Sequence, residues 1–234
     1  MLFTSCSKQN IKPADITYQD FTVELDKLAQ KKAEVADLKN LKQGYGRFFD
    51  VWFSEIMDYS KYRGFSDEEI TQVFGQWLQV NKPVFRILKS HYEKETNWRI
   101  DLNIQWGHLQ TLLPETPTPQ LVGYFSQFSN YNTFVDTTEN GQLLLGYSKE
   151  MFLNDTFPLY QMLEVPSFYN RYNSPEQIPT MLIWNYLKST FEPKHKIKNM
   201  LDQAVFDGKI WSVLMEISNG KNPFEMLGYS GSEW

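Results

Sequence analysis

The sequence has few of the residues from which catalytic and metal sites are usually built. Its 234 residues include one cysteine, Cys6, so no internal disulfide can form and packing must hold the fold together. The three histidines are His91, His108 and His195, and none of them lies four residues from another. That spacing is the one by which a zinc-peptidase helix presents two imidazoles to a metal. The sequence therefore contains no histidine-based zinc motif of that kind.

Long apolar runs and an excess of basic charge are also missing. No apolar run approaches the roughly 20 residues needed to span a bilayer. The net charge of −5 argues against a nucleic-acid groove. No phosphate-binding loop is present, and residues 228–232 lack the final glycine of a nucleophile elbow. Hydrophobic residues nevertheless make up 41% of the chain, which is enough for a substantial core.

The surroundings of the single cysteine are informative. Cys6 follows a short apolar run, Leu2-Phe3, and two small residues, Thr4-Ser5. This context indicates the attachment point of a bacterial lipid anchor, for which two or more acyl chains give stable membrane binding. A free thiol in a frayed terminus is the alternative. We interpret residues 1–18 as the remnant of a lipoprotein signal followed by a polar tether, since a complete signal needs a longer apolar core.

The remaining chain, residues 19–234, is predicted to form one mainly helical domain with a small β-hairpin, an α+β fold. Apolar residues recur at helical spacing over 21–41 and again over 48–56. Ser66 and Glu69 form a capping box that begins a further helix.

Prolines and small polar residues predict where the other helices begin and end. We expect Pro83 to end one helix and start the next, because proline suits a first helical turn. Asp101 is expected to cap a further helix. Later helices are predicted over 174–189 and 194–206, with Gly208 as the stop of the last.

Three strands are predicted between these helical regions, over 121–126, 131–137 and 142–147, because branched and aromatic residues concentrate there. The dipeptide Asn140-Gly141 predicts a type I′ turn between the second and third strands.

Aromatic residues are abundant, with 17 Phe, 13 Tyr and 7 Trp. Rings at helical spacing are expected in the core. A cluster around the hairpin is the best candidate for a contact surface toward a protein or a sugar. Its members are Tyr124, Phe125, Phe128, Tyr131 and Phe134.

Four stretches, in the same order and spacing, carry a family resemblance: residues 48–57, 126–137, 145–160, and 201–210 with 228–234. The third is the most specific, with a glycine, an acid, an aromatic-Leu pair and Pro-x-Tyr, although Asn154 stands where a glycine is usual. Together they resemble the gliding motility lipoprotein GldB family.

The resemblance implies a lipoprotein of the cell envelope, anchored through Cys6 and facing the periplasm, in gliding Gram-negative bacteria or their non-gliding relatives. Its partners would be other gliding or secretion proteins of the envelope. It also implies a helical fold distantly similar to predicted zinc peptidases, in which a hairpin precedes a metal-binding helix. Residues 174–189 match that helix and contain no histidine, so we expect a degenerate, non-enzymatic relative without metal or cofactor. Family members continue beyond the last motif, so a C-terminal segment is expected to be missing.

Three functions remain open. The first is a non-enzymatic lipoprotein that supports gliding or the associated secretion machinery by protein binding. The second is a hydrolase of envelope peptides or glycans that uses carboxylates near Glu150 and Glu176. The third is a sugar-binding module that uses the hairpin aromatics.

Overall fold

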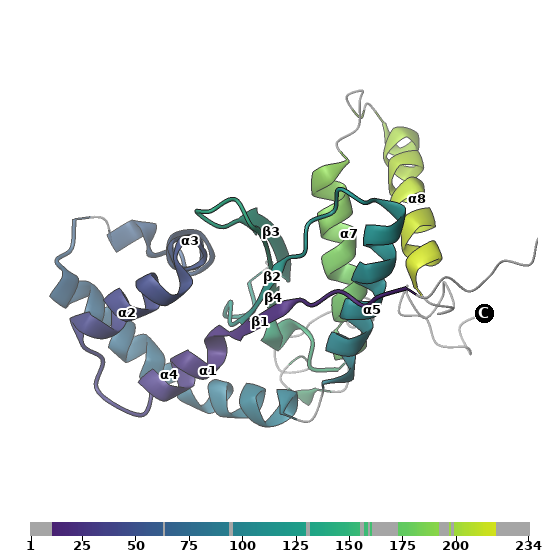
Figure 1. Cartoon of the computed structure of the whole chain (residues 1–234). Helices are drawn as coiled ribbons and strands as arrows, with labels where there is room; N and C mark the ends of the chain where they lie inside the picture. The colour runs from purple at the N-terminus through teal and green to yellow at the C-terminus, as the bar shows by residue number, and fades with distance from the viewer. Residues whose placement is uncertain are drawn as a thin grey trace, which may run out of the picture.

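The computed structural model (Figure 1) places a small mixed sheet between two groups of helices. It describes residues 11–62, 64–93, 96–129, 132–154, 157, 158, 160, 173–191, 197 and 199–218. The strand order is β1-β2-β4-β3, with bounds Thr17–Asp20 (β1), Gln120–Tyr124 (β2), Thr133–Thr137 (β3) and Leu143–Ser148 (β4). β1 and β4 both pair parallel with β2, whereas β3 pairs antiparallel with β4.

Helices cover both faces of the sheet. On one side lie α1 (Phe21–Leu28), α2 (Val35–Tyr45), α3 (Arg47–Val51) and α4 (Asp67–Tyr92), with a π-helical turn (Trp52–Ile56) and a 3₁₀ helix (Tyr59–Tyr62) between α3 and α4. On the other lie α5 (Asn97–Leu112), α7 (Ile178–Thr190) and α8 (Met200–Ile217). The short 3₁₀ helices Lys149–Met151 and Pro175–Gln177 follow β4 and precede α7. The expected mainly helical α+β class is confirmed.

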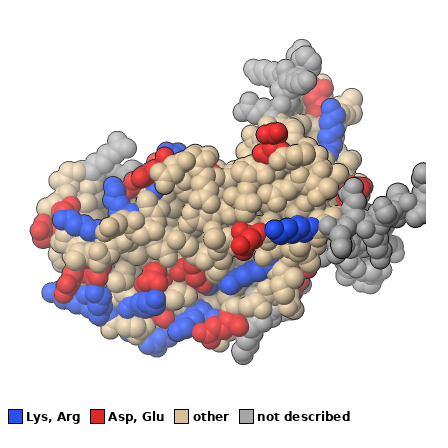
Figure 2. All heavy atoms as spheres, viewed as in Figure 1, with Lys and Arg blue, Asp and Glu red and all other residues tan. Residues whose placement is uncertain are grey.

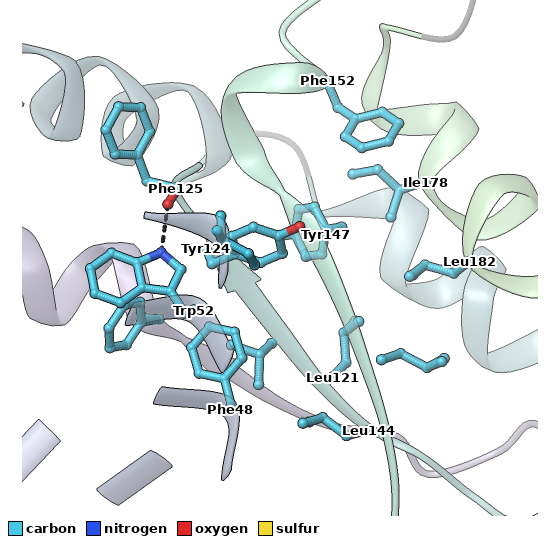
Figure 3. Packing of buried hydrophobic residues seen from close by; sticks show 14 of the residues in the cluster. Phe48, Trp52, Leu121, Tyr124, Phe125, Leu144, Tyr147, Phe152, Ile178 and Leu182 are labelled. Carbon is cyan, nitrogen blue, oxygen red and sulfur yellow. Dashed lines mark hydrogen bonds between the residues drawn. The ribbon is translucent and has the colours of Figure 1, made fainter. Parts of the chain in front are cut away.

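The core is rich in aromatic rings that join the sheet to the helices. The Trp52 ring packs edge-on to Phe21, with centroids 4.7 Å apart. Its Nε1 donates a 2.7 Å hydrogen bond to the backbone oxygen of Phe125, just after β2 (Figure 3). On the same side, Phe134 stacks on Phe48, with centroids 5.8 Å apart. The hydrogen bond from Trp52 gives the only polar atom of its indole ring a partner, as a buried Trp requires.

Most predicted helices are confirmed, including the capping box, in which Ser66 Oγ accepts from Glu69 N. The expected break at Pro83 is wrong, because α4 runs through it from Asp67 to Tyr92. Proline removes one helical N–H, but buried Leu78 and Phe85 on either side pack in the core and keep the helix continuous.

Two other helix boundaries also differ from expectation. α5 begins at Asn97, so Asp101 lies inside it rather than at its cap. α8 continues through Gly208 to Ile217 because Ile210 and Leu214, beyond the glycine, are buried. Tertiary burial outweighs the roughly 1 kcal/mol that a glycine costs within a helix.

The hairpin between β3 and β4 is confirmed, but its turn is not type I′. Gly141 N donates to Thr138 O (2.9 Å) and Thr138 N donates to Gln142 O (2.8 Å). Of Asn140 and Gly141, only the glycine has a positive φ, 76°. This is a three-residue loop whose glycine occupies the left-handed position.

The sequence analysis placed the boundary between tether and domain after residue 18, which falls inside β1. Thr17 and Tyr18 pair with Gln120 and Leu121 of β2. Residues before β1 also pack on the body, since Ala14 N donates to Asn103 O of α5 at 2.8 Å. The sequence did not indicate this strand, because it is only four residues long.

Candidate functional site

The carboxyl ends of the three parallel strands meet at one edge of the sheet, and polar residues follow each of them. Asp20 ends β1, Ser126 follows β2, and Ser148 ends β4 with Lys149 and Glu150 next in the chain. In sheets with parallel strands, this edge is where binding and catalytic groups most often gather. A functional site is therefore expected at this edge.

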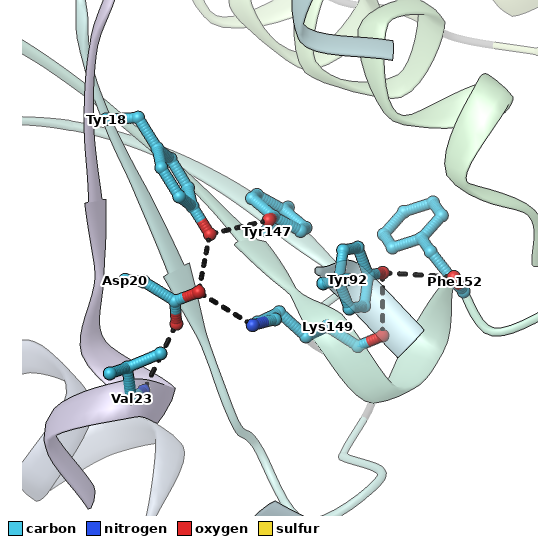
Figure 4. A network of polar contacts seen from close by, with 7 residues as sticks. All are labelled: Tyr18, Asp20, Val23, Tyr92, Tyr147, Lys149 and Phe152. Atoms are coloured by element: carbon cyan, nitrogen blue, oxygen red, sulfur yellow. Dashed lines mark hydrogen bonds and ion pairs between the residues drawn. The ribbon is translucent and has the colours of Figure 1, made fainter. Parts of the chain in front are cut away.

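A buried ion pair lies at the centre of this edge (Figure 4). Lys149 Nζ is 2.7 Å from Asp20 Oδ2, and the lysine side chain is only 1% exposed. The other carboxylate oxygen of Asp20 accepts from Val23 N at 3.2 Å and so caps α1. Tyr18 Oη donates to Asp20 Oδ2 and lies 3.0 Å from Tyr147 Oη. One carboxylate thus joins β1, α1 and the end of β4.

Burial sets the protonation of the groups around the pair. It lowers the pKa of Lys149, although the Asp20 carboxylate acts in the opposite direction. Burial raises the pKa of Tyr18, Tyr92 and Tyr147 well above the usual value, so these hydroxyls stay protonated at neutral pH. Tyr92 Oη donates a hydrogen bond that is shared between the backbone oxygens of Lys149 (2.9 Å) and Phe152 (3.0 Å).

Glu150 forms a second enclosed cluster beside the pair. Its Oε1 accepts from Ser126 N (2.6 Å), Ser126 Oγ (2.7 Å) and Phe128 N (3.1 Å). Gln127 and Phe128 both have φ of 58°, a left-handed pair that helps to turn the loop amides toward the carboxylate. Ser126 Oγ also lies 2.9 Å from Ser148 Oγ. Burial raises the pKa of Glu150, while the hydrogen bonds from Ser126 act to lower it.

These contacts make the edge a fastening between segments. Lys149 forms an ion pair with Asp20. Ser126 Oγ bonds to Glu150 and Ser148, and not to a histidine that could activate it as a nucleophile. Both Lys149 and Glu150 are buried, so substrate has no evident access to them. No group of three or more His, Cys, Asp or Glu residues within the described ranges could hold a metal ion. The chemistry present here holds β1, β2 and β4 together.

The predicted aromatic surface is wrong for two of its members. Tyr124 and Phe125 are buried, because β2 is an inner strand with helices on both sides. Tyr124 packs against Phe48, and Phe125 packs against Phe85.

The other predicted site residues have different positions. Phe128 and Phe134 are half-buried and pack on the edge of the core. Cys6 and Tyr131 lie outside the described residues, so the lipid site stays a prediction.

The acids and histidines that the sequence analysis considered differ in how deeply they are buried. Glu150 is enclosed, whereas Glu176 is exposed in the 3₁₀ helix before α7. His91 is half-buried at the end of α4, His108 is half-buried in α5, and His195 lies outside the described residues. The described structure gives no support to the hydrolase alternative built on Glu150 and Glu176.

The sequence prediction missed Asp20 and Lys149. Asp20 directly precedes a helical pattern, so its capping role had a signal in the sequence. The pairing with Lys149, 129 residues away, had none.

A hollow lies elsewhere in the described structure, between α4 and the segment that joins α1 to α2. This groove, of about 1300 Å³, is lined on one side by residues 29–35 and on the other by α4 from Glu68 to Lys82. Exposed Gln72 and Gln76 project from successive turns of α4 along it. We call it the α4 groove.

Fold and site together define a helical protein built around a small mixed sheet, with its N-terminal strand fastened into that sheet. The sequence profile of the family described as gliding motility protein GldB matches residues 5–234, and the chain belongs to this family. No curated protein and no solved structure matches the chain. Similarity to a zinc peptidase fold is therefore not supported.

Membership of this lipoprotein family implies a role in gliding motility and association with the cell envelope. None of the helices in the described ranges is both long and apolar enough to cross a membrane.

Proposed function

We propose that lipid on Cys6 holds this protein at a membrane of the cell envelope, on its periplasmic side. From there the single body domain supports gliding motility, and the secretion machinery associated with it, by binding other envelope proteins. The family match over the chain supports the motility role. The Asp20–Lys149 ion pair and the pairing of β1 with β2 hold the start of the body in place, and so limit how far it can lie from that anchor.

The distance between anchor and body is short. Thr17 begins β1 eleven residues after Cys6, and β1 pairs with β2 along its whole length. Eleven extended residues span at most about 40 Å. A protein lipidated at Cys6 thus keeps its sheet within that distance of the bilayer, and its partners must be reached close to the membrane.

The α4 groove is the surface best suited to a partner. Its walls carry amide side chains, Gln72 and Gln76, which can both donate to and accept from a peptide backbone. An extended segment of another envelope protein is the occupant that fits this chemistry. The half-buried hairpin rings, Phe128 and Phe134, form the second candidate surface.

Gliding cells test both surfaces. Gln76→Arg would place a long charged side chain in the α4 groove without disturbing the core, since Gln76 is exposed. Gln142→Arg is the matched change beside the hairpin, where Gln142 is also exposed. We expect Gln76→Arg to reduce colony spreading at unchanged protein level and Gln142→Arg to leave it normal.

Other outcomes would redirect or overturn the proposal. Loss of spreading with Gln142→Arg alone would move the contact to the hairpin. Normal spreading in a clean deletion of the gene would contradict a role in gliding, and normal spreading with Cys6→Ala would contradict the need for the lipid. In a non-gliding strain, the measurement is secretion of the proteins exported by the associated machinery.

A further inference from the structure

A second, smaller pocket lies on the face of the sheet that α2 and α3 cover, and it has a volume of about 180 Å³. Side chains of β1, β2 and β4 form its floor. Its walls are the junction of α2 and α3 and the turn between β3 and β4, which Figure 1 shows beside α3. Side chains alternate along a strand, so Gln19 points away from the face that carries Tyr18 and Asp20. The pocket is therefore separate from the buried ion pair.

Two carboxamides lie in the floor of this pocket, on a face where apolar side chains are the rule. Gln120 pairs with Leu144 and Gln19 with Val122, so the four side chains share one face of the sheet. Val122 and Leu144 are buried, whereas the two glutamines are half-buried. Gln120 Nε2 donates to Gln19 Oε1 at 2.7 Å. A carboxamide has two donors and two lone pairs, and this bond uses one donor and one lone pair, so the floor keeps several hydrogen-bonding positions for a ligand.

The walls add further polar groups and one aromatic ring. Asn140 supplies another carboxamide from the turn. Glu139 reaches across toward α3, since its Oε1 lies 3.7 Å from the place of a Cβ at Gly46. Tyr45 lines the pocket from the end of α2, and its ring is held edge-on against Phe21, with centroids 4.7 Å apart. A ligand here meets one apolar ring surface and a group of amides.

We propose that this hollow, which we call the amide pocket, binds one ring of a neutral saccharide. Sugar hydroxyl groups both donate and accept, and a carboxamide or a carboxylate can bond to two neighbouring hydroxyls at once. The C–H face of a sugar ring is apolar and packs on an aromatic side chain such as Tyr45. Pockets for drug-sized ligands have volumes of about 300–1,000 Å³, so the smaller amide pocket suits a single ring.

The charges around the amide pocket do not favour an ionic ligand. Among its described lining residues Arg47 is the only basic one, and its Nε forms a 2.9 Å ion pair with Asp136. A phosphate group would need cations or amides that are free to surround it. Glu139 is exposed, so solvent and salt screen its charge. Over the described residues, Figure 2 shows acidic and basic side chains interspersed, without a large patch of one sign in that view. A neutral ligand fits this setting best.

Saturation-transfer NMR on the purified full chain tests for the sugar directly. The probes are glucose, galactose, mannose and N-acetylglucosamine at millimolar concentration, which differ in the orientation or substitution of their hydroxyl groups. We expect at least one of them to receive saturation from the protein, and no transfer to any of the four would overturn the proposal. The linear tetramer of the sugar that responds identifies the source. Tighter binding than that of the single ring indicates a glycan chain, and equal affinity indicates a free sugar.

A side chain added at Gly44 tests whether the sugar lies in the amide pocket. Gly44 lines the pocket, and a Cβ there would have open space around it. Gly44→Leu should fill part of the pocket and abolish the saturation transfer, while α2 stays folded because leucine is the better helix former. The matched control is Gly208→Leu in α8, on the other side of the sheet, where a Cβ also has open space. This control should respond like the unchanged protein.

The floor amides give a second test that does not depend on filling the pocket. Gln19→Leu together with Gln120→Leu removes both partners of their hydrogen bond, so neither amide is left unpaired. The double variant should bind the sugar about tenfold more weakly or worse, because two or more hydrogen bonds to hydroxyl groups are lost. A sugar signal that survives both this change and Gly44→Leu would come from another site and would overturn the proposal. Loss of the signal with Gly208→Leu would overturn it equally, since the effect would not be local.

Saccharide binding at the amide pocket is independent of the proposed function. The NMR measurement uses purified protein and no gliding cells, so its failure is distinct from a failure of the motility role. Gln142 lines the amide pocket, and Gln142→Arg is expected to leave spreading normal. Sugar binding and the partner contact at the α4 groove are thus measured separately.

Discussion

Replacing Asp20 with asparagine tests the buried fastening of β1. The asparagine oxygen still accepts from Val23 N, so the cap of α1 stays, but the charge facing Lys149 is lost. Lys149 is 1% exposed and cannot be solvated where it lies. Breaking a buried ion pair by removing one partner costs about 3–5 kcal/mol.

Deprotonation of Lys149 sets an upper limit on this loss of unfolding free energy. An unpaired ammonium can give up its proton, and from an unfolded pKa of about 10.4 this costs about 4.6 kcal/mol at pH 7. At pH 9 the same limit is about 1.9 kcal/mol. The pKa of Lys149 is already lowered in the folded state, so the unfolded chain binds this proton more tightly. Stability therefore rises with pH up to the unfolded pKa, and the variant should recover part of its loss on the alkaline side.

Urea unfolding followed by tryptophan fluorescence measures both values. We expect Asp20→Asn to lose about 3 to 4.5 kcal/mol at pH 7 and at most about 2 kcal/mol at pH 9. Lys149→Met and the double variant complete the cycle, and the double variant should lack the pH dependence. A loss below 1 kcal/mol at pH 7, or an equal loss at both pH values, would show that the pair does not fasten β1.

Three other changes test the packing and charge of the described core. Burial raises the pKa of Glu150, so its protonated form favours the fold, and stability falls as pH rises from about 4.5 through the folded pKa. Glu150→Gln, which keeps an acceptor for Ser126 N, should lack this fall; urea unfolding between pH 4 and 8 checks it, and parallel curves would contradict the reasoning. Gly146→Ala should cost about 1–3 kcal/mol, because its methyl group would overlap the Phe134 ring. Gly208→Ala, with open space around it in α8, should instead raise stability by about 0.5–1 kcal/mol. Urea unfolding measures both glycine variants, and destabilisation by Gly208→Ala would show that its exposed face is covered.

Local patterns determined most of the secondary structure. Helices and hairpin follow from residue spacing and turn chemistry, which act over a few neighbours, and the capping box at Ser66 is an example. The same local signals gave wrong boundaries at Pro83 and Gly208. At both places burial of residues farther along the helix outweighs the preference of a single residue.

The sequence by itself determined the class of the protein, its family and the position of the one cysteine. Only the tertiary structure decided that β1 belongs to the sheet, that Tyr124 and Phe125 are core residues, and that Lys149 pairs with Asp20. Parallel pairing joins strands a hundred residues apart and leaves no turn motif between them to announce it. The enclosed edge of the sheet and the amide pocket are for that reason properties of the folded chain alone.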